Sequence, residues 1–231
     1  SSGHAICKHF FSPFMVKEEN DENLPPYAIG CWGCKRQIMK YESQLSLKEE
    51  IVKDAFWKLS KKQDVQILPI IGSPLEENYR NKIELKVHNN TYAYYNSESH
   101  DRVDIAKCLL ASDAINEIVD YHSFMDIKNG DITIRSNADN ELLIIVKCDR
   151  FEFFNDPPSN VKGVVVNDKI VYGNNFFFDT IGDYKFKVSY NAFFQINNYI
   201  ANEIFNILKE NIKGNNLLDL YCGSGVMGIA L

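Results

Sequence analysis

The sequence lacks any long apolar run, any internal repeat and any low-complexity tract. A helix needs about 20 apolar residues to cross a bilayer, so no segment is expected to span a membrane. The start shows no basic-then-apolar signal peptide. Cysteine is scarce, with six in 231 residues, which argues against a secreted disulfide scaffold. These absences predict a cytoplasmic protein, without a membrane partner, in a reducing compartment.

What the sequence does contain is typical of a folded protein. Hydrophobic residues make up 45% of it and its charges are scattered, as in globular rather than disordered chains. The net charge of −6 argues mildly against a nucleic-acid partner. However, residues 31–62 hold eight basic residues against four acidic ones, and a local basic face can bind phosphates on an acidic protein. A solvated helix face explains the same charges equally well.

The periodicity of apolar residues divides the chain into three parts. Ser46 and Glu49 have capping-box spacing, and the apolar residues that follow recur at helical intervals, which predicts a helix from Ser46 to about Lys62. From Val65 the period changes to two, which predicts a mostly antiparallel sheet. Its expected elements are strands at 83–87, 92–94, 132–135, 142–148, 161–166, 170–172, 176–178 and 184–190 and one helix at 113–121.

A second helix and a glycine-rich turn follow the sheet. Asn197 or Asn198 caps this helix, whose expected buried stripe contains Ile200, Ala201, Ile204, Ile207 and Leu208, and Gly214 ends it. A buried strand at 217–220 then leads into the turn. The expected fold class is therefore α/β, with an α+β central domain followed by the start of a Rossmann-like domain. The expected domains are 1–64 with the cysteines, 65–190 with the sheet, and 191–231.

The glycine turn is the first candidate site. Gly223, Gly225 and Gly228 allow a tight turn in which backbone can approach a ligand closely. Dinucleotide-binding and methyl-donor-binding folds share this spacing, and a packed βα turn is a third reading. Asp219, four residues before the first glycine, favours S-adenosylmethionine, because a dinucleotide site places that glycine directly after an apolar strand.

The cysteines form the second candidate site. Cys31 and Cys34 are three apart, Cys7 lies upstream, and Cys108 is a plausible fourth ligand. Four thiolates suit zinc or an iron–sulfur cluster equally well. Cys148 and Cys222 are expected to be packing residues.

Five segments, in this order along nearly the whole chain, resemble the RNA uracil-C5 methyltransferases, particularly the iron–sulfur members that modify ribosomal RNA. The segments are Cys31–Gln37, Asn78–Lys82, Val103–Leu109, Tyr190–Asn197 and Asp219–Gly225. The spacing between Cys7 and Cys31 is longer than usual in that family, and the β-barrel domain that precedes the cluster in some members is not expected here.

The resemblance implies roles for particular residues. Cys7, Cys31, Cys34 and Cys108 match the ligands of a 4Fe–4S cluster, for which zinc is the alternative. The positions matching S-adenosylmethionine contacts are Gln195, Asp219, Tyr221, Gly223, Gly225 and Val226. In this family a cysteine thiolate adds to uracil C6 and a base removes the C5 proton. Both groups are expected beyond residue 231, so no catalytic residue is assigned in this chain.

The expected function is S-adenosylmethionine-dependent methylation of uracil C5 in RNA, with 23S ribosomal RNA as the first expected substrate and tRNA as the alternative. The other reading is a non-enzymatic RNA-binding module that holds RNA through the cysteines and the basic helix. A zinc-containing dehydrogenase is disfavoured by Asp219. The protein is expected to be a monomer whose central domain, residues 65–190, faces the RNA.

Overall fold

The computed structural model describes residues 39–61, 65–95, 101–120, 124–214 and 216–231. The chain divides into two compact units, Ser1–Pro74 and Leu75–Leu231. The domain boundaries expected from the sequence remain a prediction. Within the described residues, no helix has the length and apolar character of a membrane span.

The described part of the first unit is built on α2 (Tyr41–Ser60), followed by an extended segment. The predicted helix is confirmed, but its predicted start is wrong. Ser46 lies inside the helix, where its hydroxyl donates to the Glu42 carbonyl instead of capping. The helix instead begins at Tyr41. The Tyr41 hydroxyl oxygen also accepts a 2.6 Å hydrogen bond from the Ser73 amide of the extended segment.

Charge on α2 is partly neutralised along the helix itself. The Lys53 ammonium pairs with Glu50 at 3.2 Å and the Lys58 ammonium with Asp54 at 3.0 Å. Exposed pairs of this kind contribute little to stability, but they reduce the net positive charge of the predicted basic face.

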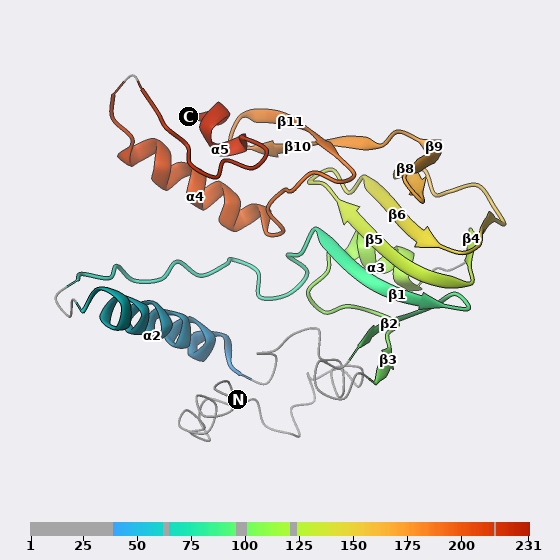
Figure 1. Cartoon of the computed structure of the whole chain (residues 1–231), viewed down its shortest axis with the longest axis horizontal. Coiled ribbons are helices and arrows are strands. Elements are labelled where there is room, and N and C mark those ends of the chain that lie inside the picture. Colours follow the sequence, from blue (N-terminus) through green and yellow to red (C-terminus); the bar gives the residue numbers. More distant parts are fainter. Residues whose placement is uncertain (1–38, 62–64, 96–100, 121–123, 215) are drawn as a thin grey trace. The chain divides into compact units, whose positions relative to one another are not determined.

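The second unit is centred on a seven-stranded sheet with the order β3-β2-β1-β5-β6-β8-β9 (Figure 1). All neighbouring pairs are antiparallel except β6 with β8. The strands are β1 (Lys82–His88), β2 (Thr91–Tyr95), β3 (Arg102–Asp104), β5 (Asn129–Ser136), β6 (Leu142–Cys148), β8 (Val161–Val166) and β9 (Lys169–Gly173).

A short helix and a separate two-stranded sheet accompany the seven-stranded sheet. The helix α3 (Asp113–Asp120) contributes Ile115, Ile118 and Val119 to the core, and β4 (Met125–Ile127) pairs with β7 (Phe151–Phe153). The mixed α/β fold with a mostly antiparallel sheet is therefore as predicted. The sequence did not indicate the parallel β6–β8 pair, because a strand with both faces covered reads as a continuous apolar run in either orientation.

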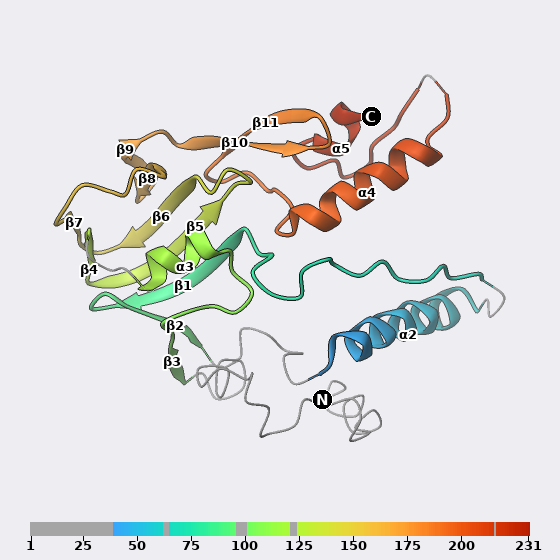
Figure 2. The ribbon, with the colours of Figure 1, turned by 180° about the vertical axis from the view of Figure 1, so that it is seen from behind.

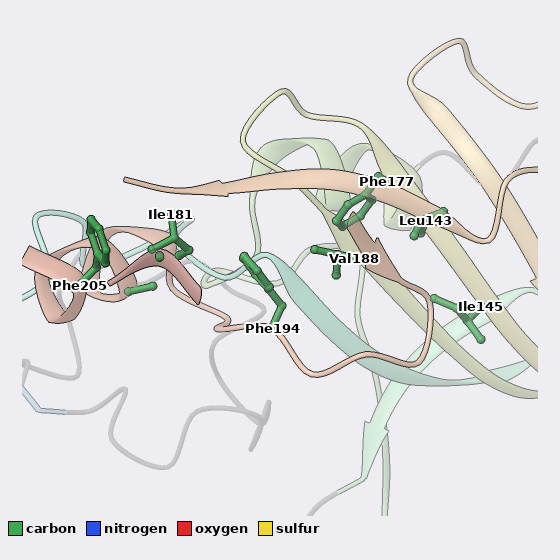
Figure 3. Packing of buried hydrophobic residues seen from close by; sticks show 9 residues of the cluster. Leu143, Ile145, Phe177, Ile181, Val188, Phe194 and Phe205 are labelled. Carbon is green, nitrogen blue, oxygen red and sulfur yellow. The ribbon is translucent and has the colours of Figure 1, made fainter. Parts of the chain in front are cut away.

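A separate hairpin, β10 (Phe176–Ile181) and β11 (Tyr184–Ser189), lies next to the helix α4 (Asn198–Asn211) (Figure 2). Figure 3 shows the apolar cluster of this region, with Phe194 between Phe177 and Val188 on one side and Ile181 and Phe205 on the other. Each fully buried phenylalanine stabilises the fold by roughly 1.5–3 kcal/mol. The cluster therefore anchors the segment that carries Gln195.

Two predictions for the last part of the chain need correction. Of the predicted stripe of α4 only Ala201 is buried, together with Phe205, whereas Ile204 and Ile207 remain about 40% exposed. Residues 217–220 form no strand, and Leu218 and Leu220 are largely exposed. A strand needs a hydrogen-bonded neighbour, and no described residue pairs with this segment. The predicted turn into a helix is confirmed, since α5 (Val226–Ala230) begins directly after Gly225.

Candidate functional site

The glycine turn before α5 exposes its backbone. Gly223 and Gly225 have φ values of 58° and 71°, in the left-handed region that glycine adopts without strain. A Cβ at Gly223 would meet nothing within 4 Å. Tyr221 also has a positive φ of 61° and is fully exposed. The backbone at Gly223 is thus open to a ligand, whereas the Gly225 amide already donates to the Cys222 carbonyl at 2.9 Å.

Asp219 and Gly228 approach each other closely across the turn. A Cβ at Gly228 would lie 2.9 Å from Oδ2 of Asp219 and 3.3 Å from its Cβ. The absence of a side chain at Gly228 therefore lets the Asp219 carboxylate lie against α5. This contact explains why the acid and the third glycine occur together in the sequence.

The segment that carries Gln195 is joined to the glycine turn by a hydrogen bond. The Ser224 hydroxyl donates to the Phe193 carbonyl at 3.1 Å. Phe194 is buried in the apolar cluster, whereas Phe193 and Gln195 are exposed. Asn197 caps α4 as predicted, because its side-chain oxygen accepts from the Ile200 amide at 3.1 Å. The structure thus brings the turn and the Gln195 segment together.

Arg135 on β5 holds the chain just before this segment. It is 4% exposed, and its Nη1 donates to the carbonyls of Ser189, Tyr190 and Ala192 at 3.1, 3.3 and 2.8 Å. Its guanidinium carbon lies 5.8 Å from the centre of the Phe177 ring. Burial lowers the pKa of Arg135, and the negative charge of Asp179 opposes that shift.

Asp179 on β10 extends this polar network. The Asp179 carboxyl accepts from the Thr180 amide at 2.9 Å and from Nδ2 of Asn198 at 3.3 and 3.4 Å. Burial raises its pKa, against the opposing effect of these hydrogen bonds and of the Arg135 charge. The Oδ1 of Asn198 accepts from Nδ2 of Asn81 at 2.7 Å, and the same Nδ2 donates to the Gln195 carbonyl at 2.8 Å. Gln195 is therefore fixed through its backbone.

The stretch before β1 connects the Gln195 segment to the turn that contains Cys108. The Asn81 amide donates to the Ile196 carbonyl at 2.9 Å, and the Arg80 amide donates to Leu110 at 2.7 Å. The Ser112 amide donates to the Arg80 carbonyl at 2.9 Å. Three segments that are remote in sequence thus meet at residues 78–81.

Asn116 on α3 fixes the backbone around Cys108. Its Oδ1 accepts from the Cys108 amide at 2.8 Å, and its Nδ2 donates to the carbonyls of Cys108 and Ala111, both at 3.0 Å. Cys108 is 6% exposed, and its thiol accepts from the Tyr94 hydroxyl at 3.8 Å. The thiol is therefore held in one place.

The other predicted cluster ligands, Cys7, Cys31 and Cys34, lie outside the described residues. In the described part of the chain, no group of three metal-binding side chains comes together. Cys148 is half-buried, and burial, followed by the charge of Asp149, raises the pKa of its thiol, which lowers its reactivity. Cys222 lies exposed in the glycine turn, so its predicted packing role is wrong.

Sequence reasoning missed Arg135, Asp179 and Asn116. The sequence around two of them contains a signal. Asp179 lies on the same face of β10 as the apolar Phe177 and Ile181, and Arg135 follows the apolar Ile132 and Ile134 in β5. A charge at a position surrounded by buried residues indicates an internal polar network. Nothing in the local sequence indicates the partners of Asn116.

Three relatives show where similar sequences occur. A protein of Aquifex aeolicus named an uncharacterized RNA methyltransferase is 27% identical over 230 residues, which cover 89% of this chain and 53% of the relative. A Bacillus cereus protein with the same description is 24% identical over 99% of this chain and 58% of its own length. The tRNA (uracil(54)-C(5))-methyltransferase of Schizosaccharomyces pombe is 29% identical over 96% of this chain and 43% of its own length.

The chain thus spans about half the length of the relatives it matches. No protein-family profile matches it. A solved structure, the tRNA (uracil-54, C5)-methyltransferase of Pyrococcus abyssi with S-adenosyl-L-homocysteine, has a similar fold, with a TM-score of 0.68 and 20% identity over 87% of this chain and 56% of that one. In sequence and in fold, the chain is therefore similar to RNA methyltransferases, among them enzymes named for C5 of uracil 54 in tRNA.

Proposed function

We propose that this chain belongs to the RNA uracil-C5 methyltransferases and that its glycine turn and Gln195 segment bind S-adenosylmethionine. The observation that carries the proposal is the 3.1 Å hydrogen bond from Ser224 to the Phe193 carbonyl, which joins the two predicted halves of the donor site. The similarity to named RNA methyltransferases supports the same reaction class.

The residues present fit this donor. The open backbone at Gly223 leaves a peptide group for the polar methionine part, and the exposed Gln195 amide offers both a donor and an acceptor. Asp219, Tyr221 and Val226 flank the same turn. When bound, S-adenosylmethionine supplies an electrophilic methyl group. The role of these residues is to bind the donor and to orient it.

None of the described cysteines is assigned as the nucleophile. The Cys108 thiol is buried against Tyr94, and burial disfavours the thiolate of Cys148. Cys222 belongs to the proposed donor turn. The residues of this chain therefore account for donor binding, and the covalent steps at uracil C6 and C5 are left to other groups.

The RNA substrate is the finer part of the proposal. The sequence resemblance predicted 23S ribosomal RNA, with tRNA as the alternative. Two of the compared proteins carry a substrate in their names, and both are tRNA uracil-54 enzymes. These names favour tRNA as the first substrate to test. A cytoplasmic location and a monomeric state belong to the same proposal.

A 4Fe–4S cluster held by Cys7, Cys31, Cys34 and Cys108 completes the proposal. Cys108 offers a thiol of the right chemistry on a backbone that Asn116 fixes. Protein purified without oxygen should be brown and absorb near 400 nm, and Cys108→Ser should lower its iron content. Colourless protein with stoichiometric zinc would replace the cluster by the zinc alternative, and protein with neither metal would remove the site.

Donor binding is tested by titrating the chain with S-adenosylhomocysteine in a calorimeter. Gln195→Ala should weaken binding at least tenfold, because hydrogen bonds to a charged ligand contribute about 1.5–3 kcal/mol. Gln66→Ala, a change at an exposed glutamine of the first unit, is the matched control. Methyl transfer from labelled donor to tRNA and to 23S ribosomal RNA transcripts then separates the two substrates. RNA binding without donor binding would favour the non-enzymatic reading instead.

A further inference from the structure

The β10–β11 hairpin has two faces of different character. Along β10, Phe177, Asp179 and Ile181 are buried, whereas Phe178 and Thr180 between them are exposed. Cross-strand pairs place Ser189, Lys187 and Lys185 opposite Phe176, Phe178 and Thr180. The outer face of the hairpin therefore consists of Phe176, Phe178, Thr180, Lys185, Lys187 and Ser189.

The outer face carries two contacts between a lysine ammonium and a phenylalanine ring. The ammonium of Lys187 lies 3.9 Å from the ring centre of Phe176, and that of Lys185 lies 5.1 Å from the ring centre of Phe178. Each ammonium therefore lies near the ring of a diagonal neighbour and not near the residue directly opposite on β10. The two rings are 5.7 Å apart and nearly perpendicular, and Phe178 is 42% exposed. Aromatic and cationic groups thus alternate on one exposed surface.

The hairpin is held firmly from its other face. Phe177, Ile181 and Val188 are part of the apolar cluster with Phe205 of α4. At the tip, the Gly182 amide donates to Oδ1 of Asn202 at 2.7 Å. The outer face is therefore presented on a rigid support, so a partner need not order it on binding.

The charges on this face are available to a partner. Within the described part of the chain, no carboxylate lies within 4.0 Å of either lysine ammonium. The one acid among the strand residues of the hairpin, Asp179, points inward. We propose that the outer face of β10–β11 binds a single-stranded segment of the RNA substrate, with bases stacked on Phe176 and Phe178 and phosphates on Lys185 and Lys187.

The chemistry of the surface matches single-stranded nucleic acid. Base–aromatic stacking combined with cations that follow the backbone is the usual way in which proteins bind it. A phosphate attracts an ammonium more strongly than an exposed aromatic ring does. Each lysine can therefore leave its ring for a phosphate, which frees that ring face for a base. This inference rests on the proposed function, because it takes RNA as the substrate.

The experiment measures binding of the chain to a fluorescein-labelled oligouridylate of about 12 nucleotides by anisotropy over a salt series. Lys185→Gln with Lys187→Gln should weaken binding and reduce the slope of log K against log salt by about 1.4, since each phosphate contact contributes about 0.7. Phe178→Ala should weaken binding about tenfold with an unchanged slope. These exposed substitutions leave the apolar cluster intact, and the melting temperature checks folding.

The matched control is Lys128→Gln with Lys147→Gln, two exposed lysines outside the hairpin. Unchanged binding by the control and weaker binding by the hairpin variants supports the proposal. The proposal would be overturned if both double variants weakened binding equally or if neither weakened it. Displacement of the RNA by polyglutamate at equal charge concentration would also overturn it. Wild-type chain that binds S-adenosylhomocysteine but no RNA would also overturn it and leave donor binding standing. Loss of donor binding alone would instead count against the proposed function.

Discussion

Replacing Arg135 with methionine should destabilise the second unit strongly. The side chain is almost fully buried, and its Nη1 serves three backbone carbonyls of the segment from Ser189 to Ala192. Methionine fills a similar volume but leaves these carbonyls without their donor and Asp179 without its nearest positive charge. A buried acceptor that loses its hydrogen-bond partner costs about 1–3 kcal/mol. With three carbonyls affected, R135M should lose about 3 kcal/mol or more of its free energy of unfolding.

The measurement is urea unfolding followed by circular dichroism. The control is R150M, because Arg150 is 60% exposed and pairs only with Glu152 in the described structure. An exposed pair contributes about 0–1 kcal/mol. The same series should show weaker S-adenosylhomocysteine binding by R135M, since the loosened carbonyls directly precede Gln195. An R135M protein within 1 kcal/mol of wild type, with unchanged donor affinity, would refute the reasoning.

Three further changes test other contacts. Gly182 has a φ of 56°, and a Cβ there would collide with Cε1 of Phe205, so G182A should cost about 2 kcal/mol or more in urea unfolding. N197A removes the cap on the Ile200 amide and should cost about 1 kcal/mol, whereas N197D should restore it. Burial raises the pKa of Asp179, so the folded protein binds that proton more tightly than the unfolded chain. Stability should accordingly fall as pH rises from about 4 through the raised pKa, and D179N should remove that fall in unfolding curves measured at several pH values.

Local patterns predicted most of the elements. The apolar runs Leu142–Cys148 and Val161–Val166 match the bounds of β6 and β8 to the residue, and the turn at Asn89 and Asn90 is present with both residues at positive φ. These elements are specified by short apolar runs and by turn chemistry, which lie within a short stretch of sequence. The strand at 217–220 failed because strand formation depends on a neighbour, which a local pattern does not contain.

The candidate site was predictable only in part. The glycine turn and Asp219 form a motif, and their contact at Gly228 follows from it. Arg135, Asp179 and Asn116 act through side chains that reach groups in other parts of the chain; Arg135 and Ser189, for example, are 54 positions apart in sequence. Such contacts are set by how the hairpin packs on the sheet. They could not be read from composition or spacing.

The stretch at residues 78–81 has a consequence for hydrogen exchange. Its amides and carbonyls form hydrogen bonds both to the turn of Cys108 and to Ile196, so the same short stretch makes both contacts. Releasing this stretch from both contacts would expose the amides of Arg80, Asn81 and Ser112 in one opening event. Deuterium should therefore enter these three amides at a common rate. A ligand that tightens the Gln195 segment should slow exchange at Ser112, although Ser112 lies more than eighty residues away in sequence.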